Sequence, residues 1–354
     1  MKKTLIATAV AAVIAAPAAM ADITLGGQLQ AEIVSASGDG VKEGEGLYLS
    51  DGWEGGKQNS GNSSAFFVKG NHDIGNGLTG LYKLNFNPKF GDNFSEVGTR
   101  DAFIGLKGGF GTVLLGRLNT PYKSSTVKWD PFLATFMQAR GNGGMSGGPG
   151  GAGHNGYLGN VVAYANKFGP ATFVGAIGFD ESNDNPADGD ADNDHAISAS
   201  LNVPIGPVEF ALAYVDTAGV IGADGTDNIE AKKVGLKYGG GDVSPLTLAA
   251  HYEIVEVSVP QGDASKDFNQ IYLTGGYQFG ANTVSLGLGI TQSDADKNAA
   301  GEEIDDGEYI ALGLNHAFNK SVSALVGYTT SDPSSAGSAK DDYDLVGVSM
   351  RVKF

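Results

Sequence analysis

The chain has 354 residues, with 55 glycines, no cysteine and a formal net charge of −17 at pH 7. The lack of cysteine excludes a disulfide scaffold, and glycine this abundant disfavours a helical bundle because it destabilises helix interiors. The acidic excess argues against nucleic-acid binding, which requires clustered Lys and Arg side chains. We therefore expect a fold without long helices and without a nucleic-acid partner.

Residues 1–21 have the pattern of a secretory signal peptide. Lys2 and Lys3 precede an apolar stretch, and Ala19-Met20-Ala21 matches the small-x-small sequence that signal peptidases cleave. A transmembrane anchor is the alternative, but the apolar stretch is short for a bilayer span. We expect cleavage after residue 21, and residues 22–354 contain no run of eighteen consecutive apolar residues.

The mature segment has the two-residue period of β-strands. In residues 283–291 large apolar side chains occupy every second position, with only Thr, Ser and Gly between them. Near the end of the chain the same alternation places Ser349, Arg351 and Lys353 between apolar residues. Each such strand has one apolar face and one small or polar face that suits water.

Turn signals divide the chain into hairpins whose connections alternate between short and long. Seven short turns, such as Ile74-Gly75-Asn76-Gly77, and eight long acidic or glycine-rich segments join about sixteen strands. This layout predicts an all-β fold, a single transmembrane antiparallel β-barrel with short periplasmic turns and long extracellular loops. A secreted β-sandwich is the alternative, but the polar faces are too rich in Gly, Ser, Thr, Asn and Lys for a dry core.

Four segments resemble motifs of the general porins of Gram-negative outer membranes, in particular the trimeric sixteen-stranded kind. The segments are Phe67 to Gly70 with the turn that follows, Thr99 to Gly108, Leu115 to Asn119, and Asn160 to Tyr164. The resemblance implies a homotrimer in the cell outer membrane, surrounded by lipid and lipopolysaccharide. It also implies that Phe354 is the terminal aromatic residue recognised by the barrel-assembly machinery.

A barrel of about sixteen strands encloses an aqueous channel, because side chains from opposite walls no longer meet. Residues 119–156 form the longest loop, and the resemblance implies that this loop folds into the lumen as the constriction. It would bring Lys128, Asp130 and Arg140 to the narrowest point. On the barrel wall facing them, the alternation of side chains along the strand predicts that Lys83 points into the lumen. The resemblance, together with this alternation, predicts the same for Arg100, with Asp101 and Phe103 on the opposite face.

These charges predict a transverse electric field across the channel, although each of them could instead be an ordinary solvated group. The expected function is passive diffusion of ions and small hydrophilic solutes, with cation selectivity predicted from the acidic excess. No cofactor and no metal site are expected. The acidic run Asp188, Asp190, Asp192 and Asp194 lacks the spacing of an EF-hand, so a solvated loop is preferred to a Ca²⁺ site.

Other functions are left open. A substrate-specific porin is the nearest alternative, and a non-conducting adhesin or structural barrel is another. Catalysis is not expected, because none of the five histidines lies in a His-Glu-x-x-His pair and there is no Gly-x-Ser-x-Gly elbow. A serine and a histidine distant in the sequence could nevertheless meet in space.

Overall fold

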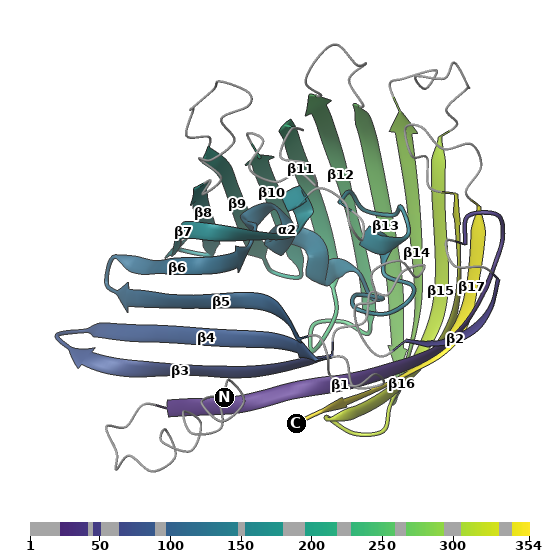
Figure 1. Ribbon diagram of the computed structural model, residues 1–354, viewed down its shortest axis with the longest axis horizontal. Helices are drawn as coiled ribbons and strands as arrows, with labels where there is room; N and C mark the ends of the chain where they lie inside the picture. Colours follow the sequence, from purple (N-terminus) through teal and green to yellow (C-terminus); the bar gives the residue numbers. More distant parts are fainter. Residues whose placement is uncertain are drawn as a thin grey trace, which may run out of the picture.

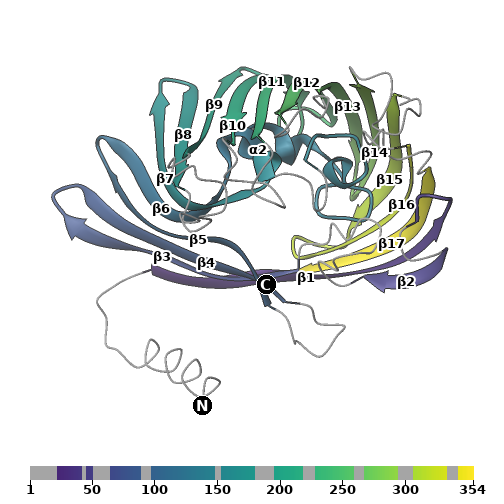
Figure 2. The same ribbon diagram turned by 45° about the horizontal axis from the view of Figure 1, so that its top comes forward.

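The computed structural model describes residues 22–41, 45–50, 64–88, 97–147, 153–179, 195–217, 228–258, 267–293, 306–332 and 342–354. The expected signal peptide 1–21 and the acidic run around residues 188–194 lie outside these ranges. Within them, sixteen long antiparallel strands close into a single barrel, which confirms the predicted fold class (Figures 1 and 2).

The barrel consists of strand β1 and strands β3 to β17. The bounds are β1 Asp22–Ser37, β3 Ala65–Gly75, β4 Leu78–Pro88, β5 Val97–Gly108, β6 Gly111–Asn119, β7 Tyr157–Phe168, β8 Ala171–Phe179, β9 His195–Ile205, β10 Val208–Asp216, β11 Asn228–Gly239, β12 Leu246–Ser258, β13 Phe268–Phe279, β14 Asn282–Ser293, β15 Gly307–Ala317, β16 Val322–Asp332 and β17 Tyr343–Lys353. The short strand β2 (Gly46–Ser50) pairs with the second half of β1.

The barrel closes between its first and last strands. β1 pairs with β17 from Gln28↔Lys353 to Ser37↔Asp344, and its first half pairs with β3. At this seam the N–H of Phe354 donates to the carbonyl of Gly27, whose N–H donates back to Phe354. Because each strand has a partner on both sides, the backbone polar groups are paired around the ring, as lipid requires.

Side chains alternate between the outside and the inside of the barrel. On β14, Val284, Leu286 and Ile290 are exposed on the outside, whereas Gly289 and Thr291 are buried inside. Exposed large apolar side chains occur on the outer faces of most strands. Such a band suits the hydrocarbon of a bilayer rather than water. No helix in the described part of the chain is long and apolar enough to cross a membrane.

The short turns have the backbone conformations that tight hairpins require. Asn76 and Gly77, between β3 and β4, both have positive φ angles of 54° and 76°, as a type I′ turn demands. Gly206, which precedes Pro207 between β9 and β10, has a φ of 59°. These residues explain why the chain reverses at the predicted positions.

The described residues of the long connection between β6 and β7, 120–147 and 153–156, lie inside the barrel, and we call them the inner loop (Figure 2). It contains the helix α2 (Pro121–Thr126) and three single 3₁₀ turns, η1 (Val127–Trp129), η2 (Ala139–Gly141) and η3 (Gly153–Asn155). Thr120 caps α2, because its hydroxyl accepts the N–H of Lys123 at 3.1 Å, and Pro121 occupies the first turn, where no N–H is needed.

Candidate pore constriction

Three tyrosines on the barrel wall hold the backbone and side chains of the inner loop. The hydroxyl of Tyr272 on β13 donates to Asp130 at 3.0 Å, and that of Tyr309 on β15 donates to the carbonyl of Met137. Tyr343 on β17 donates to the side chain of Asn142 at 2.8 Å. An irregular segment inside a barrel needs partners for its polar groups, and inward-facing tyrosines provide them.

Apolar side chains of the inner loop pack against glycines of the same wall. Phe132, Phe136 and Met137 are at most 1% exposed. A Cβ atom added at Gly327 on β16 would lie 2.4 Å from the sulfur of Met137, and one at Gly347 on β17 would lie 3.1 Å from the ring of Phe136. The missing side chains on these strands therefore create the space that the loop occupies.

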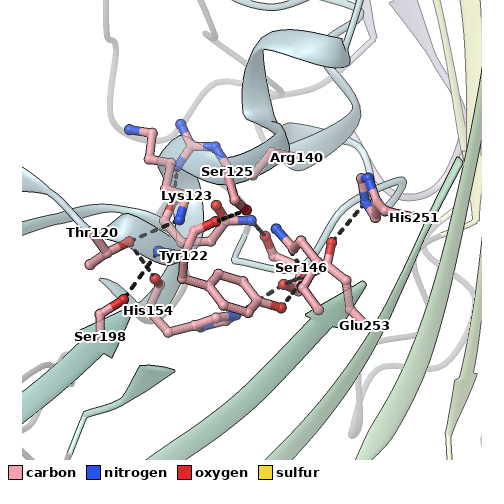
Figure 3. A network of polar contacts seen from close by, with 12 residues as sticks. Thr120, Tyr122, Lys123, Ser125, Arg140, Ser146, His154, Ser198, His251 and Glu253 are labelled. Atoms are coloured by element: carbon pink, nitrogen blue, oxygen red, sulfur yellow. Dashed lines mark hydrogen bonds and ion pairs between the residues drawn. The ribbon is translucent and has the colours of Figure 1, made fainter. Parts of the chain in front are cut away.

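Glu253 on β12 is the centre of a buried polar network between the loop and the wall (Figure 3). Its carboxylate accepts hydrogen bonds from Tyr122, at 2.6 Å, and from Ser146. Nε2 of His251 lies 2.9 Å from one carboxylate oxygen, and Nζ of Lys233 lies 3.6 Å from the other. All of these side chains are nearly inaccessible to solvent, so the contacts join two distant points of the loop to β11 and β12.

A serine and a histidine do meet in this network. Nε2 of His154 lies 3.0 Å from the hydroxyl of Ser146. The carboxylate of Glu253, however, accepts a hydrogen bond from Ser146 and not from His154, whereas in a catalytic triad the histidine lies between the acid and the nucleophile. Both residues are 3% exposed, so the pair is buried between the loop and the wall. The arrangement anchors the loop.

On the other side of the loop, four basic side chains gather near Tyr157, and we call Arg100, Arg117, Lys123 and Arg140 the basic cluster. Nε of Arg100 donates to the hydroxyl of Tyr157 at 2.9 Å. Nζ of Lys123 lies 4.0 Å from the centre of the tyrosine ring, and the guanidinium of Arg117 lies 5.4 Å from it. Arg140 donates to the carbonyl of Asn155 at 2.8 Å.

The charges of the basic cluster influence one another. Burial, followed by the positive charges of the neighbouring Arg140 and Arg100, lowers the pKa of Lys123 to about 6, while Asp101 opposes the shift. Burial also lowers the pKa of Arg140. These four groups come from β5, β6, α2 and η2, so the cluster forms only when the loop lies inside the barrel.

An irregularity between β4 and β5 corrects one expectation of strand phase. The pairing runs Leu84↔Ala102 and then Phe86↔Thr99, so two residues of β5 lie opposite Asn85. Asp101 is therefore 8% exposed and accepts a hydrogen bond from Asn85 at 2.7 Å, instead of pointing to the lipid. Alternation alone does not reveal a β-bulge, which inserts one extra residue into a strand.

The five residues predicted from the sequence fall into different surroundings. Lys83 forms a salt bridge with Asp101, and Arg100 and Arg140 belong to the basic cluster. Lys128 lies apart, paired with Glu209 of β10 at 3.3 Å with a half-exposed side chain. The structure adds Lys123 and Tyr157, for which the sequence carries no distinguishing signal, and Arg117, which lies within the porin-like segment Leu115 to Asn119.

Asp130 faces the barrel wall. Its carboxylate accepts the N–H groups of Phe132, at 2.9 Å, and Ala139, at 2.8 Å, in addition to the hydroxyl of Tyr272. Complete burial raises the pKa of Asp130 to about 6, and these hydrogen bonds limit the rise. Its position is that of a group that shapes the loop from inside. Among the described residues there is no group of three or more His, Cys, Asp or Glu side chains that could hold a metal ion.

A closed antiparallel barrel with an apolar outer face and a long loop packed in its interior is a transmembrane β-barrel of the outer-membrane type. A family model described as Gram-negative porin matches residues 7–336. The chain belongs to this family.

Among its relatives, the major outer membrane protein P.IB of Neisseria gonorrhoeae is 36% identical over 129 residues, which are 35% of this chain and 34% of that protein. The same protein of Neisseria meningitidis serogroup B is 38% identical over 125 residues, 35% of this chain and 36% of that protein. The matched segment thus spans about a third of these relatives.

Solved structures agree in fold. An anion-selective porin from Comamonas acidovorans has a TM-score of 0.74 at 18% identity, covering 94% of this chain and 100% of that one. The trimer form of OmpT, an outer membrane protein of Vibrio cholerae, has a TM-score of 0.68 at 16% identity, covering 94% and 99%.

Proposed function

We propose that the protein forms a water-filled channel for passive diffusion of ions and small hydrophilic solutes across the outer membrane, and that the basic cluster beside the inner loop is its selectivity site. The observation that carries this proposal is the convergence of Arg100, Arg117 and Lys123 on Tyr157, where the loop approaches the wall. Positive side chains at a constriction favour anions.

The sign of the selectivity depends on where the charges lie. The expectation of cation selectivity rests on the acidic excess of the whole chain, much of which is in long segments outside the described residues. The Debye length is about 10 Å at 0.1 M salt, so charges at the mouth act weakly on an ion inside the channel. Charged groups at the narrowest point lie close to each passing ion and are hardly screened from it. We therefore propose that the channel prefers anions.

Reversal potentials test this assignment. In a KCl gradient across a planar bilayer, the wild-type channel should be anion-selective. Its selectivity should shift toward cations as the ionic strength falls, because the charges at the mouth are then less screened.

Arg117→Gln should lower the chloride-to-potassium permeability ratio by roughly fivefold, because one unit charge at close range in water contributes about 1 kcal/mol. Lys167→Met, on β7 but near the periplasmic turn, is the control. A cation-selective wild type at 1 M salt would contradict the proposal.

The pKa of Lys123 predicts a pH dependence. Because this pKa is lowered to about 6, the side chain is neutral at pH 8 and gains a positive charge as the pH falls through 6. Anion preference should rise between pH 7 and pH 5, and Lys123→Met should remove most of the rise. Asp130 loses its negative charge in the same pH range. The Asp130→Asn variant therefore measures how much Asp130 contributes to the rise in anion preference. An equal rise in wild type and Lys123→Met would rule out this role for Lys123.

Further parts of the proposal rest on family membership. We infer a homotrimer, supported by the trimer form of the structurally similar OmpT, export by cleavage of residues 1–21, and assembly through the barrel-assembly machinery with Phe354 as its signal. Lys83 and Lys128 would be lumen charges outside the cluster. A substrate-specific channel for small anions is the second candidate, favoured by the same cluster, and conductance that saturates with one anion would identify it.

A further inference from the structure

The outer wall of the barrel has a groove over strands β8 to β12, with a cavity volume of about 430 Å³. Its apolar lining includes Phe173, Leu201, Leu212 and Val234, which all point away from the lumen. This volume lies within the roughly 300–1,000 Å³ range of small-ligand sites. The groove is separate from the constriction, because the sheet lies between them.

The pairing register explains the groove. Phe173, Leu201, Leu212 and Val234 stand side by side in one row across four strands. In the next row toward the extracellular end, the corresponding residues of β8 and β9 are Gly175 and Ala199. The ring of Phe173 covers Gly175, so the hollow in the outer face lies at the small side chain of Ala199, which lines the groove.

A lysine marks the extracellular end of the groove. Lys232 belongs to the same row as Ala199, opposite Tyr214, and lines the groove. It is the one lysine or arginine on the outward faces of β8 to β12 in the part of the chain that the structure describes. Its side chain is 50% exposed, with Nζ 2.8 Å from Glu230 and 3.7 Å from Glu256.

Carboxylates occupy the row beyond this lysine. Asp216, Glu230 and Glu256 are opposite one another on β10, β11 and β12, one row closer to the extracellular end. From the middle of the membrane outward, the wall therefore presents an apolar groove, then one positive charge flanked by Tyr214, and then three negative charges. A lipid with a phosphate–ammonium headgroup has acyl chain, phosphate and ammonium in the same order.

We propose that this groove binds one zwitterionic phospholipid of the phosphatidylethanolamine type, with an acyl chain in the groove, its phosphate on Lys232 and its ammonium group at Glu230 and Glu256. Lipid tails are as apolar as the groove, so the acyl chain gains only packing by entering it. The preference for this lipid therefore comes from the headgroup. A purely anionic headgroup would meet three carboxylates around a single lysine, and is disfavoured by their repulsion.

Lipid titration followed by native mass spectrometry tests the proposal on the whole protein after delipidation in detergent. We expect wild type to bind phosphatidylethanolamine at least fivefold more tightly than phosphatidylglycerol or lipopolysaccharide. Ala199→Trp should fill the groove and remove this binding, whereas Leu286→Trp, on the outer face of β14, should not. Glu230→Gln with Glu256→Gln should abolish the preference for phosphatidylethanolamine over phosphatidylglycerol.

Three outcomes would overturn the proposal. Equal binding of all three lipids by wild type would show no headgroup recognition, and tighter binding of lipopolysaccharide or phosphatidylglycerol would assign the groove to an anionic lipid. Loss of the oligomer in Ala199→Trp, with Leu286→Trp unaffected, would show that a second copy of the chain covers this face. Channel conductance does not enter the test, so its result is independent of the proposed function.

Discussion

Replacing Glu253 by glutamine is expected to lower the free energy of unfolding by about 3–5 kcal/mol, because breaking a buried ion pair leaves the remaining charge uncompensated. Lys233, with 1% of its side chain exposed, would lose its carboxylate partner and would face the ring of Tyr122 at 4.0 Å. The hydroxyls of Tyr122 and Ser146 would also lose a charged acceptor, and a carboxylate accepts a stronger hydrogen bond than a neutral amide does. The inner loop would then be held less firmly at β12.

Urea unfolding in lipid vesicles measures this effect, with fluorescence of the buried Trp129 in the inner loop as a local probe. The matched control is the double variant Lys233→Met with Glu253→Gln, which removes both charges. Replacing a buried ion pair by neutral groups of similar volume is often nearly neutral, so the double variant should recover most of the lost stability. A Glu253→Gln variant as stable as wild type, or a double variant less stable than the single one, would show that the ion pair is unimportant.

Replacing Gly289 by alanine is expected to displace the inner loop from β14. The new Cβ atom would lie 2.5 Å from Cα of Gly144 and 3.2 Å from Cβ of Tyr309. The first contact is with a backbone atom of the loop, so no side-chain rotation relieves it, and the loop itself must move. Overpacking of this kind costs about 1–3 kcal/mol. Because the moved loop carries Lys123 and Arg140, single-channel conductance and ion selectivity should both change.

The control for this substitution is Gly275→Ala on the neighbouring strand β13. Its Cβ atom would point to the outside of the barrel and meet only the side chain of Leu248, at an ordinary distance of 3.5 Å. It should leave conductance unchanged. Wild-type conductance and selectivity in Gly289→Ala would mean that the loop does not determine the channel's narrowest point.

Much of the fold could be predicted from the sequence, because it depends on patterns among residues that are close in the chain. Val346, Val348 and Met350 are exposed on the outer face and Ser349 is buried inside, as alternation predicts. The turn at Asn76-Gly77 has the predicted place and chemistry. Length alone identified residues 119–156 as the segment of interest, since a loop this long in a compact domain is usually functional or disordered.

The candidate site could be predicted from the sequence only in part. Phase predicted that Lys83 points inward, but the bulge opposite Asn85 brings both Arg100 and Asp101 to the same face, which a strict two-residue period excludes. Among the loop charges, Arg140 joins the basic cluster, whereas Asp130 is buried against Tyr272. Neighbouring residues of an irregular loop have no period, so the direction of each depends on what it packs against.

By itself, then, the sequence determined the strands, their turns and the face that side chains take in regularly paired strands, because these follow from interactions between residues close in the chain. Only the tertiary structure decided which charges meet. Glu253 bonds Tyr122 across 131 positions of sequence, and Tyr272 bonds Asp130 across 142. Such contacts exist only after the barrel has closed around the inner loop, since closure alone brings β12 and β13 next to a segment that follows β6.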